Sequence, residues 1–140
     1  MKDNYIITVV GKQTVDDESD KIEVITEGEL REENGKITIT YPEYPEDDPA
    51  KKTDTTVILD KGILSIERTG EMSSHLILEQ GVRHECLYST PVGQMFIGIF
   101  TDSISADINE HGGEINAAYQ LDFNRTVVSY NEFYISVKEK

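Results

Sequence analysis

The chain has 140 residues, one cysteine and a formal net charge of −14 at pH 7. This length fits one domain with a core of its own, and a single cysteine excludes an internal disulfide framework. The acidic balance argues against nucleic acid and anionic membrane surfaces as partners, because phosphate recognition needs clustered lysine and arginine.

The first residues, MKDNYIITVVGKQ, lack the basic and apolar regions of a secretory signal. The sequence also has no apolar run of 18 residues, the minimum for a membrane-spanning helix. We therefore expect a cytoplasmic protein.

The dominant pattern along the chain is an alternation of apolar and polar residues, which is typical of half-buried β-strands. The clearest alternating segments are 22–27, 37–41, 64–67 and 115–123, and a final segment at 127–137 is rich in β-branched and aromatic residues. Turn signals separate the segments at 34–35, 60–62, 80–81, 90–93, 112–113 and 123–125. Together they indicate about ten strands and no long helix.

The short connections favour antiparallel neighbours, because parallel strands need crossovers of a dozen residues or more. Regularly spaced strands of this kind form barrels or sandwiches. A meander that closes on itself removes its exposed edges. We therefore predict an all-β fold, a mostly meander antiparallel β-barrel of about ten strands, in one domain covering residues 1–140.

Two acidic segments interrupt the strand pattern. Residues 42–54 contain three prolines and mixed charges, which predicts a long loop within the domain. The loop is either solvated or a flap over one end of the barrel, with Tyr41 and Tyr44 covering a ligand. Residues 16–20, DDESD, read as an acidic turn, since they lack the spacing and the glycine of an EF-hand calcium loop.

Several short motifs in fixed order resemble the YwiB-like family of uncharacterised bacterial proteins. They are IERTG at 66–70, LEQGVR at 78–83, YSTPVGQM at 88–95, the glycines at 112–113, YQLDF at 119–123 and FYISV at 133–137. The resemblance implies a cytoplasmic, calycin-type, lipocalin-like barrel. The resemblance supplies no catalytic residues. It suggests a ligand inside the barrel only because barrels of similar fold hold small ligands.

Four residues are candidates for ligand binding. Tyr88 and Tyr119 are expected inside the barrel, where each phenol either has a hydrogen-bond partner in the core or orients a ligand. Arg83 either forms a clasp with Glu79 across the turn at 80–81 or holds a carboxylate at the barrel mouth. Arg68 ends an apolar face and is considered for the same role.

The segment 76–101 predicts two successive hairpins. A bulge at Gly93 would set Thr90 opposite Gln94. In that register Tyr88 faces Phe96, and both faces of the hairpin are substantially apolar. Because one face of a simple barrel looks to water, either the loop at 41–54 or a second subunit should cover the outside, and we predict a subunit contact, as in a homodimer.

His84 and Cys86 lie two residues apart on one strand, and a two-residue turn at 80–81 would set His75 opposite Cys86. Zinc accepts such ligands, but the sequence has no CxxC or HxxxH spacing. A Cys-His nucleophile pair has no third orienting group. The favoured interpretation of Cys86 is a small buried apolar residue, and neither metal nor cofactor is predicted.

The sequence thus favours a barrel that binds a small, mostly apolar ligand, with Tyr88, Tyr119, Arg83 and Arg68 near it. The alternative is a non-enzymatic interaction or scaffold protein that uses the apolar outer face of the hairpin. A small enzyme using His84 and Cys86 is the third hypothesis.

Overall fold

The structure is a computed structural model that describes residues 5–43, 52–70, 73–90 and 93–140, with the backbone alone for 88–90. The strands are β1 (Tyr5–Val15), β2 (Glu18–Glu33), β3 (Lys36–Glu43), β4 (Thr53–Asp60), β5 (Ile63–Thr69), β6 (Ser74–Glu79), β7 (Arg83–Thr90), β8 (Gly93–Asn109), β9 (Gly112–Phe123) and β10 (Thr126–Glu139). Each strand pairs antiparallel with its neighbours in sequence, and β1 pairs with β10 to close the barrel. The predicted all-β barrel is confirmed. No helix in the described ranges is long and apolar enough to cross a membrane.

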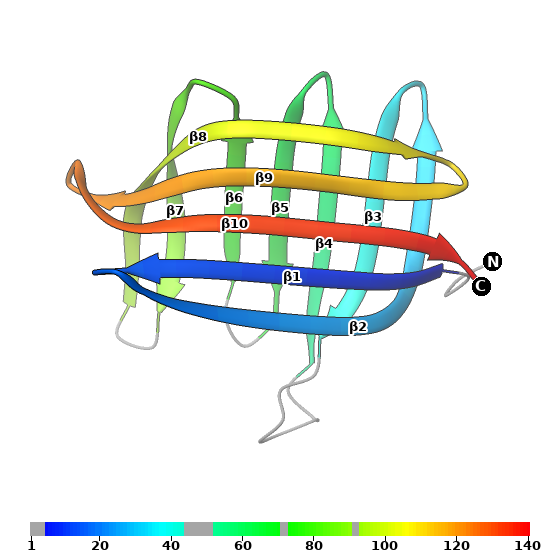
Figure 1. The fold of residues 1–140 in the computed structure, drawn as a ribbon, viewed down its shortest axis with the longest axis horizontal. Coiled ribbons are helices and arrows are strands. Elements are labelled where there is room, and N and C mark those ends of the chain that lie inside the picture. Colours follow the sequence, from blue (N-terminus) through cyan, green and yellow to red (C-terminus); the bar gives the residue numbers. More distant parts are fainter. Residues whose placement is uncertain (1–4, 44–51, 71–72, 91–92) are drawn as a thin grey trace.

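The barrel is flattened into two layers, and the strands of one layer run across those of the other (Figure 1). We call the layer of β1, β8, β9, β10 and the first half of β2 the front sheet. The back sheet contains β3 to β7. The strands β2 and β8 bend and contribute to both sheets, as corner strands do in orthogonal packings (Figure 1).

Gly28 lies at the corner in β2. It pairs with Tyr5 on β1, whereas the next residue, Glu29, already pairs with Thr40 on β3. A side chain at Gly28 would contact the Thr40 carbonyl oxygen and come within 2.5 Å of Ile7 Cδ1. Only glycine lets the two sheets approach this closely at the corner.

The second corner, in β8, contains a bulge. Thr101 pairs with Tyr119 and Ser103 pairs with Ala118, so one extra residue interrupts the ladder between β8 and β9. Bulges bend a strand and shift which side chains face inward. Ile99 and Thr101 are therefore inward before the bulge, and Ile104 is inward after it, opposite the buried Ala117.

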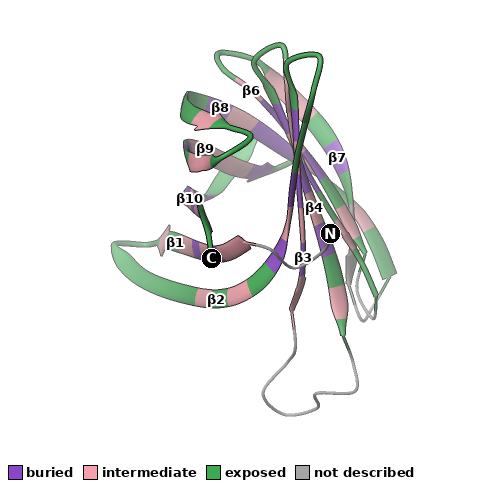
Figure 2. Cartoon of the chain, turned by 90° about the vertical axis from the view of Figure 1, so that its right-hand side faces the viewer, coloured by how far each residue is buried: buried purple, intermediate pink, exposed green. Residues whose placement is uncertain are grey.

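The core lies between the two sheets (Figure 2). Its fully buried side chains come from alternating positions on both layers, and include Ile7, Ile39, Leu64, Leu78, Ile115 and Ile135. Both sheets keep their other face toward water, which is why the sequence alternates so regularly.

The turn predictions are partly confirmed. The pairs Asn34–Gly35 and Lys61–Gly62 have positive φ at both residues, as two-residue hairpin turns require. The glycines at 112–113 were expected in a turn, but both belong to β9. Gly113 is needed there because a Cβ would collide with the Asp107 carbonyl oxygen.

Two predicted boundaries are wrong. The expected loop 42–54 is shorter, because Pro42 belongs to β3 and pairs with Asp54 of β4. Proline is tolerated there because β2 has already left β3, so this side of β3 has no partner among the residues that the structure describes. In the hairpin of β7 and β8, Thr90 pairs with Gly93 rather than Gln94. The one-residue shift sets Tyr88 opposite Met95, not Phe96.

Candidate functional site

A row of polar side chains crosses the inner face of the front sheet. Gln13, Asn131, Tyr119 and Thr101 are consecutive cross-strand partners on β1, β10, β9 and β8. Asn131 and Thr101 are buried, and the Asn131 amide donates to Ser129 Oγ at 3.0 Å. The inner face of the front sheet is otherwise apolar, and this row is a polar strip across it.

A second polar row crosses the inner face of the back sheet. Tyr41, Thr55, Arg68 and Ser74 are consecutive partners on β3, β4, β5 and β6, and the row reaches the backbone of Tyr88 on β7. Tyr41 and Thr55 are buried, and Arg68 and Ser74 are partly exposed. The two rows place polar groups on both walls of the barrel.

The barrel is open beside these rows because two neighbouring strands separate. β2 pairs with β3 only from Glu29 onward, so within the described ranges the part of β2 before Gly28 has a partner on one side alone. The first half of β2 leads away from the back sheet (Figure 2). A cavity of about 580 Å³ lies at this opening. Its walls include Val9, Gly11, Gln13, Ile22, Val24, Glu43, Arg68, Tyr119, Asn131 and Phe133.

In the back row only Arg68, with Glu43 beside it, borders the cavity, whereas Tyr41 and Thr55 are buried and do not line it. Arg68 Nε lies 3.9 Å from Glu43 Oε2, beyond hydrogen-bond length. Burial raises the pKa of Tyr41 well above its usual range, Glu43 raises it further, and Arg68 and Thr55 partly offset the shift. Among the described residues, the Tyr41 hydroxyl and Thr55 Oγ1 have no hydrogen-bond partner of ordinary geometry, and the same holds for Thr101 Oγ1.

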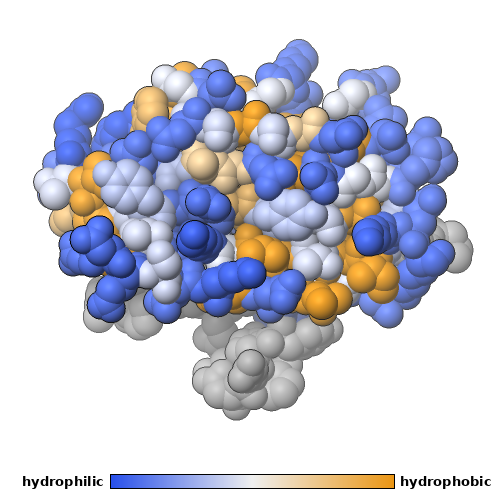
Figure 3. Space-filling model, viewed as in Figure 1, coloured by the Kyte–Doolittle hydropathy of each residue, from blue (hydrophilic) through white to orange (hydrophobic). Residues whose placement is uncertain are grey.

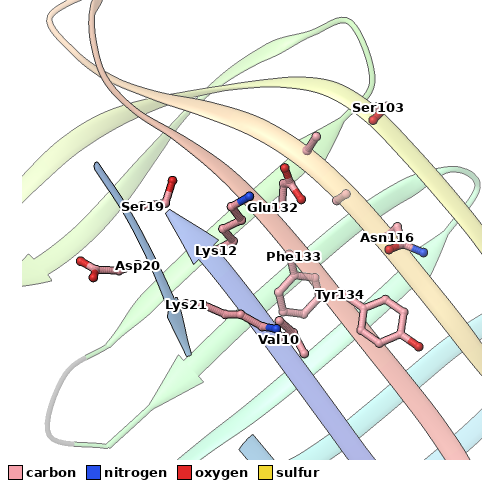
Figure 4. Close-up of a pocket in the computed structure, with 12 residues that line it drawn as sticks. Val10, Lys12, Ser19, Asp20, Lys21, Ser103, Asn116, Glu132, Phe133 and Tyr134 are labelled. Carbon is pink, nitrogen blue, oxygen red and sulfur yellow. The ribbon is translucent and has the colours of Figure 1, made fainter. Parts of the chain in front are cut away.

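A second hollow, of about 450 Å³, lies on the outer face of the front sheet. Figure 4 shows Lys12 and Glu132 close together above it, with Asn116 and Tyr134 on the far side. Lys12 is the cross-strand partner of both Lys21 and Glu132. The polar side chains that line this hollow are mostly exposed, and the surface around them contains both polar and apolar residues (Figure 3). This outer groove is the weaker candidate, because its exposed polar side chains are accessible to water without a ligand.

Two of the four predicted ligand-binding residues line the cavity. Tyr119 lies on the front wall and Arg68 on the back wall. The backbone of Tyr88 continues the back row, but its side chain is outside the described residues. The sequence thus indicated one residue on each wall without placing the cavity between them.

Arg83 is not at the cavity. It lies on the outer face of β7, and its guanidinium donates to both carboxylate oxygens of Asp122 at 2.9 and 2.7 Å. The pair crosses β8 over Gly98, where a Cβ would contact both partners. Hydrogen bonds from Arg83 lower the pKa of Asp122, and the backbone amide of Arg125 acts in the same direction. The predicted clasp with Glu79 is wrong, since Glu79 pairs with His84.

The histidines and the cysteine do not form one cluster. Glu79 pairs with Val82, as the predicted two-residue turn at 80–81 requires, but Ser74 pairs with Tyr88, so the register shifts by one residue between these two pairs. His75 Nε2 lies 2.8 Å from Ser65 Oγ, and His84 Nε2 lies 2.9 Å from Glu79 Oε1. Cys86 is buried, and burial raises the pKa of its thiol. The described ranges contain no group of three His, Cys, Asp or Glu residues suited to a metal ion.

Sequence reasoning missed most of the polar residues between the sheets. Tyr41 was assigned to a flap, and Thr55, Thr101 and Asn131 were not considered. Alternation could have placed Tyr41 and Thr55 inward, because they share the faces of Ile39 and Val57. Thr101 could not be found this way, because both faces of the preceding segment are apolar, with Phe96 and Phe100 on one face and Ile97 and Ile99 on the other.

Comparisons with known proteins agree on the fold. The family described as "Domain of unknown function (DUF1934)" matches residues 7–135. The crystal structure of the ywiB protein from Bacillus subtilis is similar, with a TM-score of 0.80 and 21% sequence identity, covering 99% of this chain and 95% of that one. A search of curated proteins finds no match. The resemblance to the YwiB-like family is confirmed, and at this identity the structural likeness concerns the fold alone.

Proposed function

Since the chain belongs to the DUF1934 family, whose function is not known, we propose from its geometry that it binds a small, partly apolar ligand at the open end of the barrel. The observation that carries this proposal is the cavity of about 580 Å³ between the two sheets. Sites for small molecules usually have volumes of about 300–1,000 Å³.

The lining of the cavity supports this function. Such sites combine apolar walls with a few polar groups that fix orientation. Here Val9, Val24 and Phe133 supply apolar surface, while Tyr119 and Arg68 supply polar groups on opposite walls. Ile22 lines the mouth and is 69% exposed, although it is a large apolar side chain. A ligand at the mouth would remove this surface from water.

Native mass spectrometry of protein purified from its own host tests the proposal. Gly11→Phe fills the cavity, because Gly11 lines it and nothing lies within 4 Å of its ideal Cβ. Val10→Phe is the matched control, since Val10 lines the outer groove instead. We expect a small-molecule adduct on the wild type and on Val10→Phe, and none on Gly11→Phe. An adduct that survives Gly11→Phe but not Val10→Phe would move the site to the outer groove.

A second candidate function is interaction with another protein molecule through the outer face of the hairpin of β7 and β8. Leu87 and Phe96 are cross-strand partners there, with 40% and 65% of their surface exposed. Exposed apolar pairs of this kind occur at interaction sites. Sedimentation of Phe96→Ser beside the wild type tests it. Self-association that the substitution abolishes would favour this role, and a monomer at high concentration in both proteins would remove the homodimer.

A further inference from the structure

The first half of β2 is an exposed sheet edge. Residues 18–27 pair with β1 on one side, and within the described ranges no strand pairs with them on the other. The segment runs along the outside of the molecule and is mostly exposed (Figure 2). A row of unpaired N–H and C=O groups is a template for another strand. We call residues 18–27 the free edge of β2.

The free edge lacks two features with which proteins usually prevent such pairing. Its ladder with β1 has no bulge, and its sequence, ESDKIEVITE, contains no proline. The centre of the segment is rich in β-branched residues, which favour strands. Ile22 and Ile25 are exposed there, one on each face of the strand. A strand added to the free edge would cover part of both side chains.

The backbone of β2 restricts how a second copy of the same strand can pair with it. In an antiparallel ladder, alternate residues direct their N–H and C=O groups to the same neighbour, and opposed residues must be of the same kind. The two-residue turn at Asp16 and Asp17 makes Val15 and Glu18 its closing pair, which belongs to the hydrogen-bonded kind. Counting from that pair, even-numbered residues face β1 and odd-numbered residues face the free side. A two-fold axis must therefore place one residue opposite its own copy.

The charges and the length of the free edge leave one position for that axis. An axis at any of residues 18–21, or at Glu23, sets like charges directly opposite each other. Such pairs destabilise a sheet. An axis at Val24 or beyond would carry the partner strand past the corner to Glu29, which already pairs with β3. Only an axis at Ile22 avoids both conflicts.

An axis at Ile22 makes the free edge complementary to itself. It sets Lys21 opposite Glu23 of the partner subunit, and the symmetry repeats this pair of opposite charges. Lys21 gains from an acidic neighbour, because its cross-strand partner on the other side is Lys12, a like charge. The paired residues, 18–26, fit within the free edge.

The other charged residues of the paired segment are also accommodated. Glu18 lies opposite Thr26 of the partner subunit and Asp20 lies opposite Val24 of the partner subunit, so no like charges oppose each other. The net charge of −14 on each copy still opposes association. At about 0.15 M salt, however, the Debye length is about 8 Å, so repulsion between distant charges is largely screened.

We propose that two copies of the chain associate through the free edge of β2, in an antiparallel pair centred on Ile22. The front sheets of the two barrels then form one continuous sheet. Because Ile22 lines the cavity, Ile22 of the partner subunit lies beside the mouth of the same cavity. This dimer goes beyond the ligand-binding function and does not depend on it.

Sedimentation equilibrium at about 0.15 M salt tests the proposal. The wild type should form dimers at high concentration, and Glu23→Lys and Lys21→Glu should each weaken the dimer at least about tenfold, because each sets like charges opposite each other. The double variant Lys21→Glu/Glu23→Lys restores the opposite charges at an unchanged net charge, and should associate like the wild type. Glu33→Lys is the matched control, because Glu33 is exposed in the part of β2 that pairs with β3.

Hydrogen exchange locates the contact without any substitution. The amides of Lys21, Glu23 and Ile25 face the free side, so their exchange should slow several-fold as the protein concentration rises. The amides of Ile22 and Val24 face β1 and should change much less. This alternation is specific to pairing at the free edge, because a contact between side chains alone would not follow it.

Three results would overturn the proposal. One is a wild type that stays monomeric at high concentration. Another is a dimer that Phe96→Ser abolishes and Glu23→Lys leaves intact, which would place the contact at the hairpin of β7 and β8. The third is a double variant that associates no better than the two single variants, because the pairing of Lys21 with Glu23 would then not hold the dimer together.

Discussion

Replacing Tyr41 with phenylalanine should make the ligand-free protein more stable. Tyr41 is 2% exposed, and its hydroxyl has no hydrogen-bond partner of ordinary geometry among the described residues. Burying such a hydroxyl costs about 1–3 kcal/mol. Phenylalanine keeps the ring and removes this cost, and we expect a gain of about 1 kcal/mol because the space left by the oxygen offsets part of the benefit.

Urea unfolding followed by circular dichroism measures this gain, which corresponds to a rise in melting temperature of roughly 2–6 °C for a domain of this size. Tyr5→Phe is the control, because the Tyr5 hydroxyl donates to the Glu110 carbonyl oxygen at 3.0 Å. It should lose about 0.5–1 kcal/mol instead. The opposite result would be a Tyr41→Phe protein less stable than the wild type by about 1 kcal/mol or more, the size of one hydrogen bond. It would refute the reasoning, because the hydroxyl would then be bonded in the folded state.

Three other predictions concern the corner at Gly28, the ion pair of Arg83 with Asp122, here called the clasp, and Cys86. Gly28→Ala should destabilise the fold by about 1–3 kcal/mol in urea unfolding, because its Cβ meets the Thr40 carbonyl oxygen; Gly11→Ala, with open space around it, should cost much less. The pKa of Asp122 is lowered in the folded state, so its contribution to stability is present above its unfolded value of about 3.9 and is lost as pH falls through the folded value. Asp122→Asn should therefore be less stable than the wild type at pH 7 and lose less stability below about pH 4, and an acid titration in which Asp122→Asn and the exposed Asp107→Asn lose stability alike would count against the clasp. Cys86 should react with iodoacetamide at pH 7 at least roughly tenfold more slowly in the folded protein than in urea, since burial raises its pKa; fast labelling of the folded protein would revive the Cys-His enzyme hypothesis.

The features that could be predicted from the sequence are those that depend on neighbouring residues. The turn at Asn34–Gly35 has positive φ at two consecutive positions, and asparagine and glycine are the residue types that adopt positive φ most readily. The strands were visible because each one buries a single face. Arg68 continues the alternation of the buried Leu64 and Ile66, and it borders the cavity.

The features that could not be predicted depend on contacts between distant segments. The hairpin of β7 and β8 was expected one residue out of register, and such a slip exchanges inward and outward side chains. The partner of Arg83 is Asp122, which lies two strands away across Gly98. Neither the bend at Gly28 nor the bulge after Thr101 leaves a signal in the alternation. The cavity exists because of these bends, so the sequence could indicate single residues of the cavity but not the cavity itself. The cytoplasmic location and the homodimer stay predictions.

Nuclear magnetic resonance of methyl-labelled protein tests the central claim, a ligand inside the open end of the barrel, most directly. Val9 and Val24 line the cavity, whereas Val10 lines the outer groove and Val137 is in the core. On addition of a small-molecule extract from the host, we expect the methyl signals of Val9 and Val24 to shift most. Shifts centred on Val10, or none in any valine, would contradict it.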